Sequence, residues 1–533
     1  MVTPLEDIRF TIAAFNTVSA GETWDTPATM GILESLAEFT DSTIAPANQD
    51  ADTKGCVLSD GRVQMPAPLV SAYQEYVALG WHLLSLPEAH GGIGAAPLAG
   101  LAAIEVLAGA SHAFQMVVSL VGGASEAIEA CGNAEQQQRL IADLASGETL
   151  ATMCLTEPGA GSDLGAIKMK AVDNGDGYWN LSGGKIFISG GDQNLTPRIL
   201  HLVLARTGPA ESRTKGLSLF ACPSHLDDGS RNAVETIRIE EKLGLHGSPT
   251  CQLSFNAAKA EMLGAPGEGL KAMFVMMNRA RLEVSLQGVA LSAQATQLAR
   301  TYAETRQQGG KTIDQHPDVK RMLMEMDATT LGARAMVYRT TALLGDSDAL
   351  TDFLTPVCKV FCSDAGSHVA DTGIQVLGGY GYLPEYGIEQ LWRDGRVTRL
   401  YEGTNGVLAM TLATRLLKLD DGNLVERFAA EIADAANLAD EPMAKCLNEL
   451  VQLWQQTATT LTESDQPGYG AMPFMQLTGL VFFLSAWARL HATRANAADP
   501  ERIEQLYRFV QADMVPNAAA LARRTAQLLQ QSW

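Results

Sequence analysis

Glu402 has the setting best suited to acid–base chemistry in this chain of 533 residues. It stands in the string WRDGRVTRLYEGTNG and is followed by Gly-Thr-Asn-Gly at positions 403 to 406. Glycines allow a bend at which a ligand can approach the backbone closely. Most lone glutamates are solvated, but apolar and glycine-rich surroundings favour a general base. Glu402 is therefore the candidate catalytic carboxylate.

A glycine-rich turn lies earlier in the chain, in Met153–Asp163, MCLTEPGAGSD. Its Gly-Ala-Gly-Ser segment exposes backbone N–H groups that can hold phosphate oxygens. Thr156 and Ser162 add hydroxyl donors. The turn alone is more typical of a tight loop entering a β domain, whereas the whole eleven-residue string is far more specific.

A third candidate segment is the alternating strand Lys185–Gly191, KIFISGG. Phe187 can wall a flat isoalloxazine ring, and the Ser189 hydroxyl can bond a reactive ring nitrogen. An ordinary strand and turn is the alternative interpretation.

The sequence patterns of the elements that position these residues predict a mainly α fold with a central β domain. Helical spacing dominates residues 1–150, and short alternating or β-branched runs follow in 151–262. A helical bundle is predicted at 263–419, with a long helix from about Gly267, and 420–533 form an additional helical domain. The long helix carries Arg281 in its apolar stripe, where a guanidinium needs a partner. Glu283 is expected about 200° away from Arg281, outside that stripe.

Composition excludes several classes of protein. The net charge of −21 argues against a nucleic-acid surface, and the eight cysteines form no C-x-x-C pair, so neither a metal site nor disulfides are expected. The N-terminus lacks a signal-peptide pattern, and the apolar run Leu477–Ala488 looks too short to span a bilayer. A cytoplasmic protein without membrane contact is predicted, with that run as a buried helix.

Together these strings resemble the acyl-CoA dehydrogenase family over roughly residues 30–415, in the family's order. LPEAHGGIG (86–94) and KLGLHGSPT (242–250) add to the match. The resemblance implies an N-terminal helical domain, a middle β-barrel or sandwich, and a C-terminal four-helix bundle. The helical domain at 420–533 is then an extension. KIFISGGDQNL, NRARLEVSLQG and the extension resemble the subgroup that includes 3-methylmercaptopropionyl-CoA dehydrogenases.

The resemblance implies FAD as cofactor and assigns contacts to it and to the acyl-CoA. Contacts to FAD fall on Met153, Leu155, Thr156, Ser162, Phe187, Ser189, Arg306, Gln375, Gly378, Gly379, Thr404 and Asn405, and contacts to the substrate on Ser162, Asn278, Arg281 and Gly403. Arg306, Gln375, Gly378 and Gly379 would meet the FAD of a neighbouring subunit, which implies a homo-oligomer. In the family an aromatic accompanies the arginine, but here RQQGGKT replaces it.

The implied reaction is α,β-dehydrogenation: Glu402 removes the α-proton of an acyl-CoA while a hydride leaves the β-carbon. Some family members carry the base one residue before the position of Arg281, which is Ala280 here. A short, medium or thioether acyl chain, an electron-transferring flavoprotein as acceptor, and a dimer are expected. An acyl-CoA oxidase is the alternative. A DNA-associated flavoprotein is less consistent, because residues 421–533 hold eight Lys and Arg against thirteen Asp and Glu.

Overall fold

The computed structural model describes residues 3–15, 26–344 and 348–531. It contains two compact units, Leu36–Ala280 and Val2–Ser35 with Arg281–Trp533. The unit boundaries fall inside helices α2 (Thr26–Phe39) and α9 (Gly269–Thr305). The division into four domains stays a prediction.

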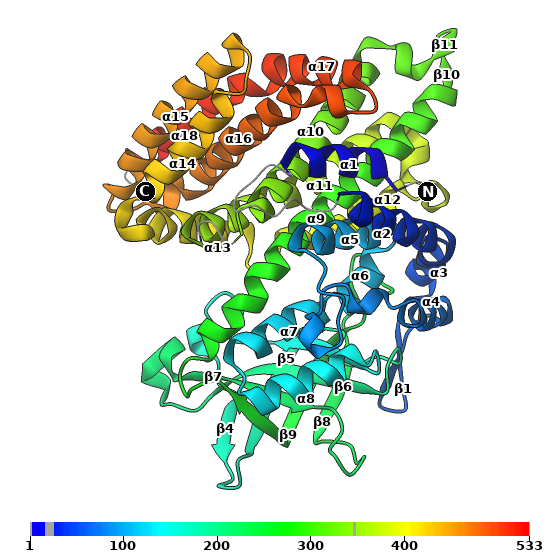
Figure 1. Ribbon diagram of the computed structural model, residues 1–533, viewed down its shortest axis with the longest axis vertical. Helices are drawn as coiled ribbons and strands as arrows, with labels where there is room; N and C mark the ends of the chain where they lie inside the picture. Colours follow the sequence, from blue (N-terminus) through cyan, green and yellow to red (C-terminus); the bar gives the residue numbers. More distant parts are fainter. Residues whose placement is uncertain (1–2, 16–25, 345–347, 532–533) are drawn as a thin grey trace. The chain divides into compact units, whose positions relative to one another are not determined.

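Helices form the first part of unit Leu36–Ala280 (Figure 1). They are α3 (Ala45–Lys54), α4 (Ala67–Ala78), α5 (Pro97–Ala110), α6 (His112–Val118), α7 (Leu120–Cys131) and α8 (Ala134–Ala145). A short hairpin of β1 (Val57–Ser59) and β2 (Arg62–Gln64) follows α3. The start of α8 is fixed locally, since Asn133 and Gln136 cap each other's backbone N–H groups in a capping box.

The rest of this unit is a seven-stranded sheet. Its strands are β3 (Thr149–Cys154), β4 (Lys170–Asp173), β5 (Trp179–Ser189), β6 (Arg198–Arg206), β7 (Leu217–Pro223), β8 (Val234–Ile239) and β9 (Thr250–Leu263). The order is β3-β6-β4-β5-β9-β7, with β8 beside β9 and a further β6–β7 pairing. Strands β6, β4, β5, β9 and β7 therefore close a circuit, as in a barrel. The predicted central β domain is confirmed.

The second unit contains a helical bundle around one apolar core. Core residues come from α9, α10 (Pro317–Ala342), α11 (Asp348–Leu377) and α12 (Ile388–Gly395). Helices α9 and α11 cross closely at Gly288, where an added Cβ would lie 2.2 Å from the carbonyl oxygen of Cys362. Residues 281–292 of α9 are buried on every side, Glu283 included. The expectation that Glu283 points away from a single buried stripe is therefore wrong, because this helix lies inside the bundle.

The last helices of this unit pack against the bundle. They are α14 (Leu424–Ala436), α15 (Glu441–Thr462), α16 (Gly468–Ala492), α17 (Pro500–Phe509) and α18 (Val515–Leu529). Helix α16 contacts α10, α11, α13 (Asn405–Thr414) and its own neighbours α14, α15 and α18 (Figure 1). A buried ion pair joins Arg339 of α10 to Glu431 of α14 at 2.6 Å. The extension thus packs directly on the bundle.

Helix α16 is the one helix in the described parts of the chain that is long and apolar enough to cross a membrane. With 25 residues it is longer than its sequence suggests, so the argument that it is too short fails. The expected burial of this helix is confirmed, because 89% of its apolar stretch of 18 residues is buried inside the protein.

Candidate active site

Glu402 lies in a tight turn between the 3-10 segment Arg396–Arg399 and helix α13. We call residues 401–405 the Glu402 turn. Glu402 and Gly403 both have left-handed backbones, with φ of 53° and 88°. That conformation is strained for a glutamate and persists only where surrounding contacts enforce it. Thr404 caps α13, since its hydroxyl accepts a hydrogen bond from the N–H of Val407 at 3.2 Å.

Two cations hold the carbonyl groups of the Glu402 turn. Nε of Arg281 on α9 donates to the carbonyl oxygen of Glu402 at 3.3 Å. Nζ of Lys359 on α11 donates to the carbonyl oxygen of Gly403 at 2.8 Å and to Oδ1 of Asn405 at 2.9 Å. Both cationic side chains are buried. The strained turn is therefore fixed by hydrogen bonds from two helices.

Asn405 is used entirely within the chain. Its Oδ1 accepts from Lys359, and its Nδ2 donates to Ser363 Oγ and to Asp364 Oδ1, both at 3.1 Å. The side chain is buried, so its amide has no group left for a ligand. The side chain of Asn405 therefore supports the turn, whereas the hydroxyl of Thr404 accepts one hydrogen bond and can still donate one. Their contacts with the cofactor stay predictions.

One oxygen of the Glu402 carboxyl group is kept out of water, while the residue as a whole is half-buried. Its Oε2 is shielded from solvent and has no hydrogen-bond partner among the residues that the structure describes. Burial raises the pKa of Glu402 from its ordinary 4.5 to about 7, while the charges of Arg281 and Lys359 oppose the rise and that of Glu283 adds to it. A carboxylate with this pKa is a stronger base near neutral pH than a solvated one.

The glycine-rich loop and the KIFISGG strand lie in unit Leu36–Ala280, where a buried lysine joins them. Nζ of Lys185 on β5 donates to the carbonyl oxygen of Leu155 at 2.8 Å and pairs with Glu157 at 3.0 Å. The N–H of Ile186 also donates to the carbonyl oxygen of Thr156 at 2.9 Å. The glycine-rich loop and the KIFISGG strand are therefore neighbours. Ser162 and Phe187 are exposed, whereas Met153 and Ser189 are half-buried.

Phe187 stands out within this strand. Its φ is 60°, and 60% of the residue is exposed. A left-handed backbone at an exposed aromatic is costly on both counts, because it combines strain with unburied apolar surface. Such a combination marks a candidate site for a flat ligand.

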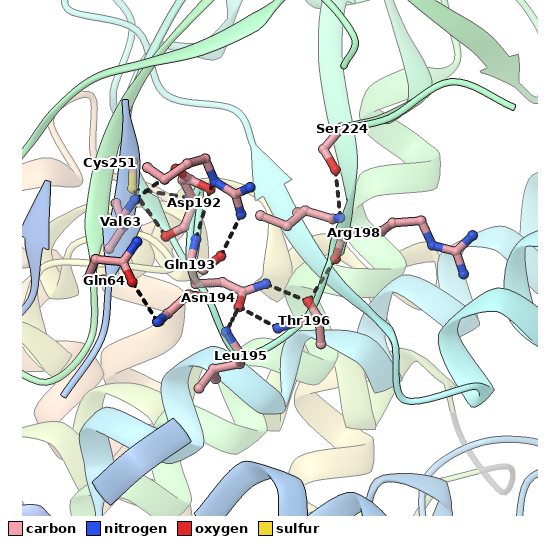
Figure 2. A network of polar contacts seen from close by, with 12 residues as sticks. Val63, Gln64, Asp192, Gln193, Asn194, Leu195, Thr196, Arg198, Ser224 and Cys251 are labelled. Atoms are coloured by element: carbon pink, nitrogen blue, oxygen red, sulfur yellow. Dashed lines mark hydrogen bonds and ion pairs between the residues drawn. The ribbon is translucent and has the colours of Figure 1, made fainter. Parts of the chain in front are cut away.

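The loop after Ser189 is held by a dense polar network (Figure 2). Asp192 accepts from Arg62 Nε at 2.9 Å and from the N–H of Val63 at 3.0 Å, both in β2. Within the loop, Oε1 of Gln193 accepts the N–H of Thr196 at 3.0 Å. The small β1–β2 hairpin thus braces the end of β5 that carries Phe187.

A cavity of about 470 Å³ lies in the second unit. Three of the four residues that we expect to meet the FAD of a neighbouring subunit line this cavity, namely Arg306, Gly378 and Gly379. The fourth, Gln375, is exposed and is not part of the lining. The guanidinium of Arg306 lies 5.4 Å from the ring centre of Tyr380. Asn278 and Arg281 lie one turn apart on α9, where Asn278 is half-buried.

Sequence reasoning missed both buried lysines. The available signal is a lysine inside an apolar run, TPVCKVFC around Lys359. A buried ammonium requires oxygen partners. The sequence does not say which oxygens these are, because the partners of Lys359 lie more than forty residues away.

Comparisons with known proteins agree with this fold. Models of the N-terminal, middle and C-terminal domains of acyl-CoA dehydrogenases match residues 26–148, 152–258 and 267–417. The chain is 35% identical to the 3-methylmercaptopropionyl-CoA dehydrogenase of Ruegeria pomeroyi, over 89% of this chain and 88% of that protein. The butyryl-CoA dehydrogenase structure from Megasphaera elsdenii is 27% identical, with a TM-score of 0.65 over 74% of this chain and 98% of its own.

A structure of an acyl-CoA dehydrogenase from Bacillus anthracis, complexed with FAD, is 23% identical to this chain. It matches with a TM-score of 0.81 over 97% of this chain and 91% of its own, so its fold extends over the C-terminal helices. The chain belongs to the acyl-CoA dehydrogenase family. It is an FAD-dependent enzyme of that family, with a helical extension after the bundle.

Proposed function

We propose that this enzyme oxidises the Cα–Cβ bond of an acyl-CoA thioester to the trans-2-enoyl-CoA, with Glu402 as the base. The observation that carries the proposal is the carboxyl group of Glu402. Its Oε2 is shielded from solvent and has no partner among the described residues, and burial raises the pKa of the group to about 7. A group in this state can take a proton from a carbon acid inside a site that excludes water.

The proposed step breaks two C–H bonds and forms one C=C bond. Glu402 takes the α-proton, and the electron pair of that bond becomes the second bond between Cα and Cβ. FAD supplies the acceptor for the hydride that leaves the β-carbon. The α-proton is a very weak acid, so the thioester oxygen needs hydrogen bonds as charge develops on it. We assign one of these to the backbone N–H of Glu402, whose direction the left-handed turn fixes.

The residues present are compatible with FAD. Phe187 offers an exposed ring, and at Gly159 and Gly161 an added Cβ would meet no atom within 4 Å, so the loop backbone is open to a phosphate. In the cavity beside Arg306, Tyr302 and Tyr380 provide aromatic surface that replaces the aromatic missing from RQQGGKT. We propose that this cavity takes the adenosine end of FAD from a second subunit.

The similarity to the Ruegeria pomeroyi enzyme supports a short, medium or thioether acyl chain. We propose an electron-transferring flavoprotein as acceptor and a cytoplasmic location, which suits eight free cysteines. The extension covers faces of α10 and α11 that would otherwise be free for further subunits. A homodimer is therefore proposed.

The test is anaerobic bleaching of the flavin by a panel of acyl-CoA thioesters that includes butyryl-CoA and 3-methylmercaptopropionyl-CoA. We expect Glu402→Gln to bind FAD and thioester but to bleach at least about 100-fold more slowly, because a general base contributes about 10²–10⁴ in rate. Exposed Glu463, in the extension, provides the control Glu463→Gln, which should bleach at the unaltered rate.

Two results would overturn parts of the proposal. Comparable bleaching rates in Glu402→Gln and the unaltered enzyme would remove Glu402 from the reaction. Stoichiometric peroxide release in air, without need of a flavoprotein acceptor, would make the enzyme an acyl-CoA oxidase.

A further inference from the structure

Lys359 has no place in the reaction described so far, yet it is one of the largest fully buried side chains of the protein. Its ammonium reaches the Glu402 turn from α11 and contacts the residues on the C-terminal side of Glu402, namely Gly403 and Asn405. A buried ammonium is costly, and a neutral side chain of equal length would fill the same space at less cost. The charge therefore calls for an explanation.

We propose that Lys359 is a positioning residue of the reaction: its ammonium locks the strained Glu402 turn and supplies the positive charge that lets the shielded carboxylate of Glu402 form. This inference rests on the proposed function and names the group that tunes its base.

The positioning part follows from the hydrogen bonds. Lys359 bridges the carbonyl of Gly403 at 2.8 Å and the amide of Asn405 at 2.9 Å, so it spans the backbone just where φ is left-handed. Arg281 donates to the carbonyl of Glu402 itself, at the longer distance of 3.3 Å. Without Lys359, the carbonyl of Gly403 loses its charged donor, and the strain at Glu402 is less well opposed.

The electrostatic part follows from the charges that face Lys359. They come from four elements: Glu402 in the turn, Arg281 on α9, Asp364 on α11 itself and Arg399 in the 3-10 segment. Asp364 is matched by Arg399, which lies 2.6 Å away, and Arg281 also faces Asp352. Glu402 is the acid whose charge acts most strongly on Lys359. Burial lowers the pKa of Lys359 to about 7, and the charge of Glu402 opposes that fall. Ionised Glu402 and protonated Lys359 therefore stabilise each other.

The experiment measures the rate of anaerobic flavin bleaching against pH, from about 5.5 to 9.5, at saturating thioester. Lys359→Gln keeps a donor for the carbonyl of Gly403 but removes the charge. Loss of a nearby opposite charge raises the pKa of a carboxyl group by about one unit or more. The midpoint of the rate should therefore move up by about one pH unit, with a loss of about fivefold at pH 7 that is largely recovered at pH 9.

Lys359→Arg restores the charge and should return the midpoint to its unaltered value, even where the larger group lowers the rate at every pH. Arg489→Met is the matched control, because Arg489 is a largely buried cation paired with Glu431 at 3.0 Å in the extension. It should lower stability without moving the midpoint.

A readout without turnover uses the loaded enzyme in the absence of thioester. The infrared band of the protonated Glu402 carboxyl group, identified by its loss in Glu402→Gln, should disappear at a pH about one unit higher in Lys359→Gln. An unchanged midpoint in both measurements would overturn the role of Lys359 while leaving Glu402 as the base. Unaltered bleaching in Glu402→Gln would instead defeat the proposed function itself.

Discussion

Replacing Glu402 by glutamine should stabilise the protein at alkaline pH while it abolishes activity. Burial raises the pKa of Glu402 from 4.5 to about 7. Between these values the unfolded chain releases the proton and the folded chain keeps it, so this group's contribution to stability is full below about pH 4.5 and falls as pH rises to 7. At 1.36 kcal/mol per pH unit, the loss reaches up to about 3 kcal/mol at pH 8 and about 1 kcal/mol at pH 5.

Glutamine has nearly the same shape and carries no proton that titrates, so it avoids this loss. The free energy of unfolding of Glu402→Gln, measured by urea denaturation of the FAD-loaded enzyme, should exceed that of the unaltered enzyme by about 3 kcal/mol at pH 8 and by about 1 kcal/mol at pH 5. Glu463→Gln, at an exposed position, is the control and should show no such growth with pH.

The reasoning would be refuted by a stability difference that stays constant or shrinks from pH 5 to pH 8. The carboxylate of Glu402 would then be as well solvated or paired in the folded enzyme as in water, and the explanation of its basicity would fail.

Two further predictions concern the C-terminal extension. An added Cβ at Gly332 of α10 would lie 2.2 Å from the ring of Phe483 and 2.5 Å from Nε1 of Trp487. Gly332→Ala should therefore force α16 away from α10 and lower the urea midpoint by an amount equivalent to about 1–3 kcal/mol. An unchanged midpoint would mean that the extension contributes little to stability. Because α16 covers faces of α10 and α11, native mass spectrometry of the FAD-loaded enzyme should give a dimer, and a tetramer would contradict the shielding role of the extension.

The outline of the fold was predictable because its signals are local. Alternating runs predict β6, β7 and β8, and the sequence predicts the start of α9 to within two residues. The burial of α9 on all sides was not predictable in the same way. Whether Glu283 meets solvent or the bundle interior depends on helices that lie far along the chain. The expectation that Glu283 lies outside the buried face of α9 was therefore wrong.

The site shows the same division between local and distant information. Glu402 and Phe187 were chosen by residue type and by the glycines that follow in their segments. Both residues have left-handed backbones in the structure. Asn405 has a chemistry that suits a ligand equally well, and only its partners at Ser363, Asp364 and Lys359 reveal that its amide is already used. Contacts across forty residues leave no mark in the local pattern.

The two buried lysines point to a common requirement of the two site segments. A loop or turn that carries chemistry leaves backbone carbonyls outside any helix or strand, and these must still be satisfied. Lys185 on β5 does this for Leu155, and Lys359 on α11 does it for Gly403, each from a regular element through a flexible stem. The arrangement gives an irregular backbone the rigidity of the element behind it. Lys185 is paired with Glu157, whereas the hydrogen bonds of Lys359 within the described part of the chain go to carbonyl and amide oxygens, so its charge remains to act on Glu402.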